Sequence, residues 1–122
     1  MLFLLSAFFI IKNEDFNYME VITVNINITK NGNELTVALE GRLDTLTSPD
    51  LEEELEDKLD GIKKLVFDLG GLEYISSAGL RVLVGSAQVM DEQDGEMIIR
   101  NITEPVKDVF DVTGFSDAFE IE

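Results

Sequence analysis

A chain of 122 residues with a formal net charge of −16 is long enough for one domain with its own hydrophobic core. Such an acidic surface repels nucleic acids and suits partners with basic patches, although the charge can also serve solubility alone. The sequence has no cysteine and no histidine, which excludes disulfides, thiol catalysis, histidine-dependent triads and histidine phosphorelay.

The N-terminal segment differs in composition from the rest of the chain. Residues 1–11 are nearly all apolar, but a membrane span needs about 20 such residues. The basic start and the small-residue cleavage site of a signal peptide are not clear. Residues 12–18 are polar and predict a linker. We expect residues 1–18 to be a dispensable extension without stable membrane insertion, and residues 19–122 to form the domain. A membrane-associated tail is the alternative.

The domain is expected to open with a β-hairpin. Residues 21–28 alternate between apolar and polar, which is typical of a half-buried strand. Asn31-Gly32 follows, and this pair favours a tight hairpin turn because both residues tolerate a positive φ. A return strand with apolar residues at alternate positions, Leu35, Val37 and Leu39, then ends at Gly41.

A first helix is predicted from Ser48-Pro49-Asp50, with Ser48 as the capping hydroxyl, proline at the first helical position and an acid in the first turn. Leu51, Leu55 and Leu59 form one apolar stripe, and Gly61 provides the stop. The acidic residues between these leucines are interpreted as a solvated helix face.

A central strand and a second helix come next. Residues 62–69 form the strand, and the run Leu65-Val66-Phe67 has little alternation, which suits a strand covered on both sides. Gly70-Gly71 predicts a turn. The second helix covers residues 78–90, with four small or apolar side chains facing inward: Leu80, Leu83, Val84 and Ala87.

After a turn at Asp94-Gly95, a strand over residues 96–100 leads to a third helix that begins at residues 103–105 and ends at Gly114. Its apolar residues are Val106, Val109, Phe110 and Val112, and Phe110 and Phe115 are expected in the core. Residues 119–121 can add a short last strand. This order predicts an α/β fold: a mixed sheet of four to five strands, covered by about three helices with right-handed crossovers.

Two serines stand where the second helix should begin. Ser76 can act as the helix cap, while Ser77, one position on, can point its hydroxyl to solvent. A phosphate on Ser77 would add a charge of about −1.5 to −2 and would meet the positive end of the helix dipole. Local chemistry alone favours the simpler alternative, in which these serines only cap the helix and are not phosphorylated.

The run Ile75-Ser76-Ser77-Ala78-Gly79-Leu80, together with Gly41-x-Leu43-Asp44, resembles the signature of the STAS domain family, in particular the bacterial anti-sigma factor antagonists. The resemblance implies a non-enzymatic cytoplasmic protein without cofactor or metal. It implies that an anti-sigma factor serine kinase is bound and phosphorylates Ser77, and that a phosphatase reverses this. The residues expected at the partner-binding surface are Asp44, Thr45, Ser76, Ser77, Ala78, Gly79 and Arg81.

One position departs from the family pattern. The residue before the acceptor is often aspartate in the antagonists, whereas this chain has Ser76, which is therefore a second, less favoured acceptor. Asp44 can also act by ordering its own loop through bonds to nearby N–H groups. A STAS scaffold that works without phosphorylation in a transport or sensory complex, and a nucleotide-binding STAS module, are the alternative functions.

Overall fold

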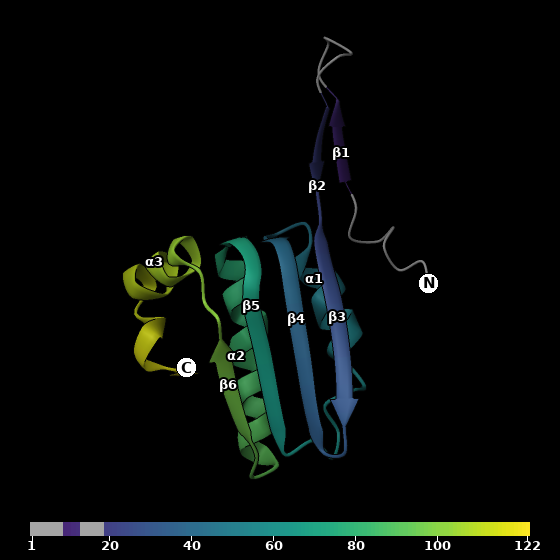
Figure 1. Cartoon of the computed structure of the whole chain (residues 1–122), viewed down its shortest axis with the longest axis vertical. Coiled ribbons are helices and arrows are strands. Elements are labelled where there is room, and N and C mark those ends of the chain that lie inside the picture. Colours follow the sequence, from purple (N-terminus) through teal and green to yellow (C-terminus); the bar gives the residue numbers. More distant parts are fainter. Residues whose placement is uncertain (1–8, 13–18) are drawn as a thin grey trace.

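The computed structural model describes residues 9–12 and 19–122, and the side chains from Thr23 onward. A five-stranded mixed sheet and three α-helices form the body of the described chain, which confirms the predicted fold class (Figure 1). The strands lie side by side in the order β3 (Val24–Asn31), β4 (Glu34–Leu43), β5 (Lys64–Ile75), β6 (Glu96–Arg100) and β7 (Glu120–Ile121). The helices are α1 (Ser48–Leu55), α2 (Ser77–Glu92), α3 (Glu104–Thr113) and the short 3-10 helix η2 (Phe115–Asp117).

The predicted hairpin is present, and β3 pairs antiparallel with β4 across a turn at Gly32, where φ is +66°. The strand expected over residues 21–28 is interrupted at Thr23, however. Before this residue, β2 (Met19–Ile22) pairs with β1 (Phe9–Lys12) in a separate two-stranded sheet, which projects past the end of the main sheet in Figure 1. Residues 1–8 and 13–18 lie outside the described residues, and the predicted extension and linker fall largely on them.

The turn predicted at Gly70-Gly71 is wrong, because β5 continues through both glycines to Ile75. Around the glycines the parallel pairing of β5 with β4 is irregular, and its register shifts twice between Ala38 and Arg42 of β4. Each shift gives β5 one more residue than its partner, which is the geometry of a β-bulge. The longer strand carries the chain to the edge of the sheet where α2 begins.

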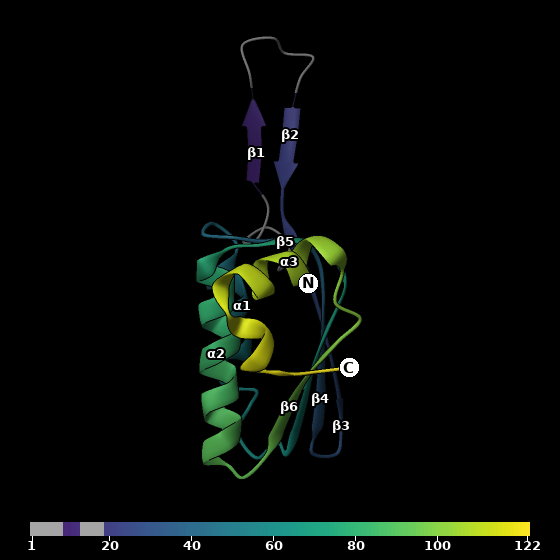
Figure 2. The same ribbon diagram turned by 90° about the vertical axis from the view of Figure 1, so that its left-hand side faces the viewer.

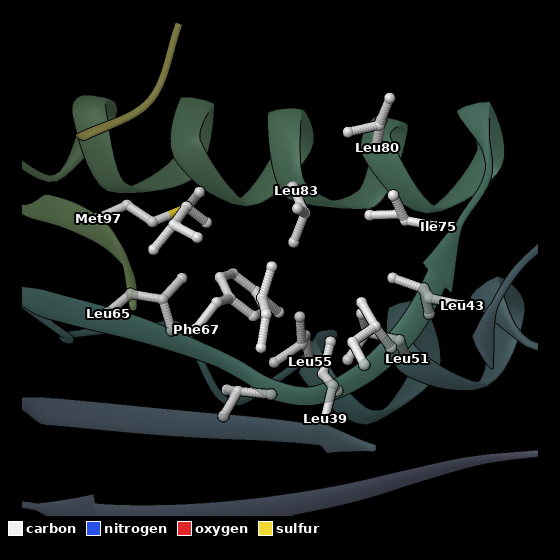
Figure 3. Packing of buried hydrophobic residues seen from close by; sticks show 14 of the residues in the cluster. Leu39, Leu43, Leu51, Leu55, Leu65, Phe67, Ile75, Leu80, Leu83 and Met97 are labelled. Carbon is white, nitrogen blue, oxygen red and sulfur yellow. The ribbon is translucent and has the colours of Figure 1, made fainter. Parts of the chain in front are cut away.

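The main core lies between the sheet and the helices α1 and α2, which cover the same face of the sheet (Figure 2). Figure 3 shows how Leu55 from α1 and Leu83 from α2 point toward Phe67 of β5. Leu65, Val66 and Phe67 are all buried, as the missing alternation predicts. Removing this much apolar surface from water is the main stabilising contribution to the fold.

Helix α1 is shorter than its leucine stripe suggests. Its N-cap is Thr47 and not Ser48, because the Ser48 hydroxyl donates instead to the Asp44 carbonyl at 2.6 Å. The helix ends at Leu55, and Leu59 follows in a turn but remains buried. Gly61, with φ of +79°, lies in that turn rather than at the helix end.

Helix α3 ends at Gly114 in the left-handed conformation, as predicted. Val106 and Phe110 are fully buried, and the Phe110 ring lies 5.7 Å from that of Phe119. Phe115 is only half-buried and stacks on Phe119 at 6.0 Å. Val112 is 86% exposed, so it does not belong to the apolar face of the helix.

Candidate functional site

The two serines stand at the junction of β5 and α2. Ser76 is the N-cap of α2, with extended backbone angles, and its Oγ accepts from the Gly79 N–H at 3.5 Å. Its own N–H donates to the Leu43 carbonyl at the end of β4, at 2.9 Å. Ser77, the first helical residue, is exposed. The predicted division between a capping serine and an exposed serine is therefore confirmed.

Gly79 explains why the helix can begin so close to the sheet. A Cβ on this residue would lie 2.8 Å from Cγ1 of Ile75 and 2.9 Å from both Cγ and the carbonyl oxygen of Leu43. Atoms cannot approach that closely, so a glycine is required here. Because Gly79 is itself buried, it positions the site and offers no side chain to a partner.

The loop between β4 and α1 lies beside the serine junction, because Leu43 pairs with Ile75 at the ends of β4 and β5. Asp44 Oδ1 accepts from the N–H groups of Leu46 and Thr47, at 3.0 and 3.1 Å. The buried Thr47 hydroxyl accepts from the Asp44 N–H at 2.9 Å and donates to the Arg42 carbonyl at 2.8 Å. Asp44 thus orders its loop, which presents exposed Thr45 and Leu46 to solvent.

Arg42 and Tyr74 form a second feature of this edge. The two residues pair across β4 and β5, and the guanidinium lies 4.4 Å from the centre of the tyrosine ring. Arg42 Nε also lies 3.6 Å from Oδ2 of Asp44. A cation over an aromatic face holds that ring in place and leaves its edge available for contact.

Large apolar side chains remain exposed around the site. Leu46, in the loop after β4, is 56% exposed, and Tyr74, near the end of β5, is 37% exposed. Sequence reasoning missed Arg42, Leu46 and Tyr74. Arg42 and Leu46 flank the Leu43-Asp44 motif, and Tyr74 comes two residues before Ser76, but only the strand register brings Arg42 and Tyr74 together.

A cleft of about 200 Å³ separates the start of α1 from the start of α2. Of the predicted partner-binding residues, it brings together Thr45, Ala78 and Arg81. Arg81 is four residues after Ser77 on the same helix, so the two side chains share one side of α2. The cleft is also lined by Ser48, Pro49, Glu52 and Val82.

The described residues offer little basis for other chemistry. Within residues 9–12 and 19–122, every helix is too short or too polar to cross a membrane. In the same part of the chain, no three acidic side chains gather where they could hold a metal ion. The arrangement combines an ordered loop, exposed apolar side chains and an exposed hydroxyl at a helix start.

Comparison with known proteins places this arrangement in a family. The sequence profile of the STAS domain matches residues 25–122, which covers both the Asp44 loop and the serine junction. The chain belongs to the STAS domain family. This STAS domain is 36% identical over 88 residues to BtrV of Bordetella bronchiseptica, a proposed anti-sigma factor antagonist, and the match covers 71% of this chain and 76% of BtrV.

Further relatives agree in length and fold. The anti-sigma-B factor antagonist of Bacillus subtilis is 29% identical over 100 residues, which cover 82% of this chain and 92% of that protein. The unphosphorylated form of the anti-sigma factor antagonist SpoIIAA superposes with a TM-score of 0.71 at 15% identity, over 80% of this chain and 88% of SpoIIAA. The phosphorylated form of SpoIIAA, from Bacillus, superposes with a TM-score of 0.64 at 14% identity, over 80% and 91% of the two chains. At these identities the superpositions establish the fold.

Proposed function

We propose that this STAS domain is an anti-sigma factor antagonist whose activity is switched by phosphorylation of Ser77. In its unmodified form it binds an anti-sigma factor, which releases the sigma factor for transcription. The anti-sigma factor is a serine kinase that phosphorylates Ser77 with ATP, and a phosphatase removes the phosphate. The observation that carries the proposal is the exposed Ser77 at the start of α2, beside the ordered Asp44 loop.

The names of the relatives support the class of partner. BtrV and the Bacillus subtilis protein carry names that refer to anti-sigma factors, and SpoIIAA is known in both unphosphorylated and phosphorylated forms. All are named for opposing another protein rather than for a reaction. We therefore propose a binding protein of the cytoplasm, where sigma factors act, and not an enzyme.

Ser77 is the better acceptor of the two serines for a structural reason. Ser76 is half-buried and its Oγ accepts from the Gly79 N–H, so the hydroxyl already has a role in capping α2. Phosphorylation of Ser76 would place a bulky group against the junction with Leu43. Ser77 is exposed, and its modification leaves the cap in place.

The phosphate changes the surface without disturbing the core. At the first position of α2 it lies at the positive end of the helix dipole, which favours an anion by about 0.3–1 kcal/mol. Toward a partner the same group is unfavourable, because a doubly charged phosphate must lose its water to enter an interface. A change of about 1.4 kcal/mol in binding free energy alters the affinity tenfold, so one phosphate suffices for a switch.

Exposed side chains around Ser77 provide the contact surface that we propose. Leu46 and Tyr74 supply apolar and aromatic area, and such residues contribute strongly when they are buried at the centre of an interface. Thr45 and Arg81 add polar contacts at the edge of the 200 Å³ cleft. We propose that these residues form the interface together with the Ser77 hydroxyl.

Mass spectrometry after incubation with ATP and a candidate anti-sigma factor kinase tests the proposal. We expect one phosphate, mapped to Ser77, and none on a Ser77→Ala variant. Ser77→Ala should bind the kinase constitutively and Ser77→Asp poorly. Phosphate on Ser76 alone would move the switch to the other serine, and equal binding by both Ser77 variants would remove it. Capture of transporter subunits without any sigma-regulating kinase would instead favour a scaffold role.

A further inference from the structure

A second concave surface runs along the outer side of the helical layer. Helices α1 and α2 lie side by side on one face of the sheet (Figure 2), and the groove between them has a volume of about 380 Å³. Its apolar lining comes from both helices and from the turn after α1: Leu55, Leu59, Val82 and Val89. Glu52, Arg81 and Val82 also line the 200 Å³ cleft near Ser77, so the two hollows adjoin each other. We call the whole surface the α1–α2 groove.

Gly85 keeps this groove open. It lies in the middle of α2, where glycine is less favourable than alanine by about 1 kcal/mol. A Cβ at this position would meet nothing within 4 Å, so packing within the chain does not require a glycine. Its φ is not positive, so the backbone does not require one either. The missing side chain is therefore explained by neither packing nor backbone geometry, and its effect is to leave room between the helices.

The polar groups along the groove already have partners within the chain. The Ser86 hydroxyl donates to the Val82 carbonyl at 2.9 Å. The Gln93 side-chain amide donates to the carbonyls of Leu59 and Ile62, both at 2.9 Å. Since these donors are satisfied, the inner surface of the groove favours an apolar occupant over a polar one.

The rim of the groove is acidic. Glu52, Glu56 and Asp60 line it together with one cation, Arg81. None of these three acids takes part in a salt bridge within the described residues. Three acidic side chains thus stand against one cation, and this excess of negative charge complements an occupant that carries lysine or arginine at its edges.

The length of the groove indicates the shape of the occupant. The lining residues on α2 extend from Ala78 to Gln93, which is about 22 Å at 1.5 Å per residue. A helix of about fifteen residues has the same length. Helices that dock in such grooves insert apolar side chains at positions i, i+3 or i+4, and i+7.

We propose that the α1–α2 groove binds a basic amphipathic helix of a partner protein. The apolar face of this helix packs on Val82 and Val89, which are partly exposed on α2 before and after Gly85, and its basic edges meet Glu52, Glu56 and Asp60. The groove adjoins the proposed kinase-contact surface at Arg81, but the contacts proposed here lie along Val82, Gly85 and Val89 and do not depend on phosphorylation.

A synthetic peptide of about fifteen residues, with leucine on one helical face and lysine on both edges, is the probe. We expect it to shift the backbone amide signals of Val82, Gly85 and Val89 in nuclear magnetic resonance spectra at about 0.15 M salt. Gly85→Leu fills the groove and should weaken binding at least about tenfold. Gln88→Leu adds the same side chain on an exposed part of α2 outside the groove, and should bind as the wild type does.

Equal binding by Gly85→Leu and Gln88→Leu would overturn the proposal, as would peptide-induced shifts confined to the opposite face of the sheet. A scrambled peptide of the same composition should leave the amide signals of Val82, Gly85 and Val89 unshifted. If both peptides shift these signals, recognition of an amphipathic helix is contradicted. If Gly85→Leu melts below the wild type, Glu56→Lys provides the second variant, with the same expected loss of binding. Because no kinase takes part, failure here leaves the Ser77 proposal standing.

Discussion

Two glycines of α2 provide a paired test of how the serine junction is built. Gly79 and Gly85 lie on the same helix, and both can be replaced by alanine. At Gly79 the new Cβ would lie 2.8–2.9 Å from atoms of Ile75 and Leu43, including the Leu43 carbonyl oxygen. At Gly85 it would meet nothing within 4 Å. The same chemical change should therefore stabilise the chain less at Gly79 than at Gly85, or destabilise it.

The magnitude follows from two contributions. Alanine is a better helix former than glycine by about 1 kcal/mol in a helix interior such as that around Gly85, and the gain is no larger at Gly79 in the first turn of α2. Overpacking at Gly79 costs about 1–3 kcal/mol, because a backbone carbonyl cannot move aside as a flexible side chain can. Since the gain at Gly79 does not exceed that at Gly85, Gly79→Ala should be less stable than Gly85→Ala by about 1–3 kcal/mol or more. In a chain of 122 residues that corresponds to roughly 4 °C in Tm for each kcal/mol.

Urea unfolding followed by far-ultraviolet circular dichroism suits the measurement, since the chain has no tryptophan. Gly85→Ala should raise the midpoint above that of the wild type, and Gly79→Ala should lower it relative to Gly85→Ala at an unchanged slope. Equal stability of the two variants would refute the claim that close contact with β4 sets the start of α2.

Three further predictions concern single side chains. Ser76→Ala removes the cap of α2 and should lower the unfolding free energy by about 1 kcal/mol, whereas Ser76→Asp should retain the cap; equal stability of both would contradict the capping role. Asp44→Asn keeps an acceptor for the Thr47 N–H and should remain near wild type in urea unfolding, while Asp44→Ala should lose about 1–3 kcal/mol. The hydrogen bond from Ser116 and the nearby Lys107 ammonium hold the pKa of Asp111 below its ordinary 3.8. The contribution of ionised Asp111 to stability should therefore be present above pH 3.8 and be lost as the pH falls through the lower pKa of the folded state. Ser116→Ala should raise the pKa of the Asp111 carboxyl, measured by nuclear magnetic resonance.

Much of the fold could be predicted because its signals are local. Asn31-Gly32 identified the hairpin turn, and Gly114 marked the end of α3. The serine junction was predictable for the same reason, since a capping residue acts on the N–H three residues later. These features need only the neighbouring residues of the chain.

One error arose where a strand distant in the sequence decides the structure, and another where a competing local hydrogen bond does. Gly70-Gly71 has the composition of a turn, but pairing with β4 extends β5 through it. Serine is a residue type that often caps helices, but the Ser48 hydroxyl donates to the Asp44 carbonyl, and Thr47 takes the N-cap position of α1. The α1–α2 groove could not be predicted, because its shape depends on how the two helices lie against each other.

The most direct test of the central claim compares the affinity of one anti-sigma factor kinase for the unmodified chain and for the chain phosphorylated on Ser77. Both forms should melt at similar temperatures, because the phosphate meets the favourable end of α2 and leaves the core intact. The phosphorylated form should bind at least about tenfold more weakly, which corresponds to a loss of about 1.4 kcal/mol. Equal affinity of the two folded forms would contradict the account.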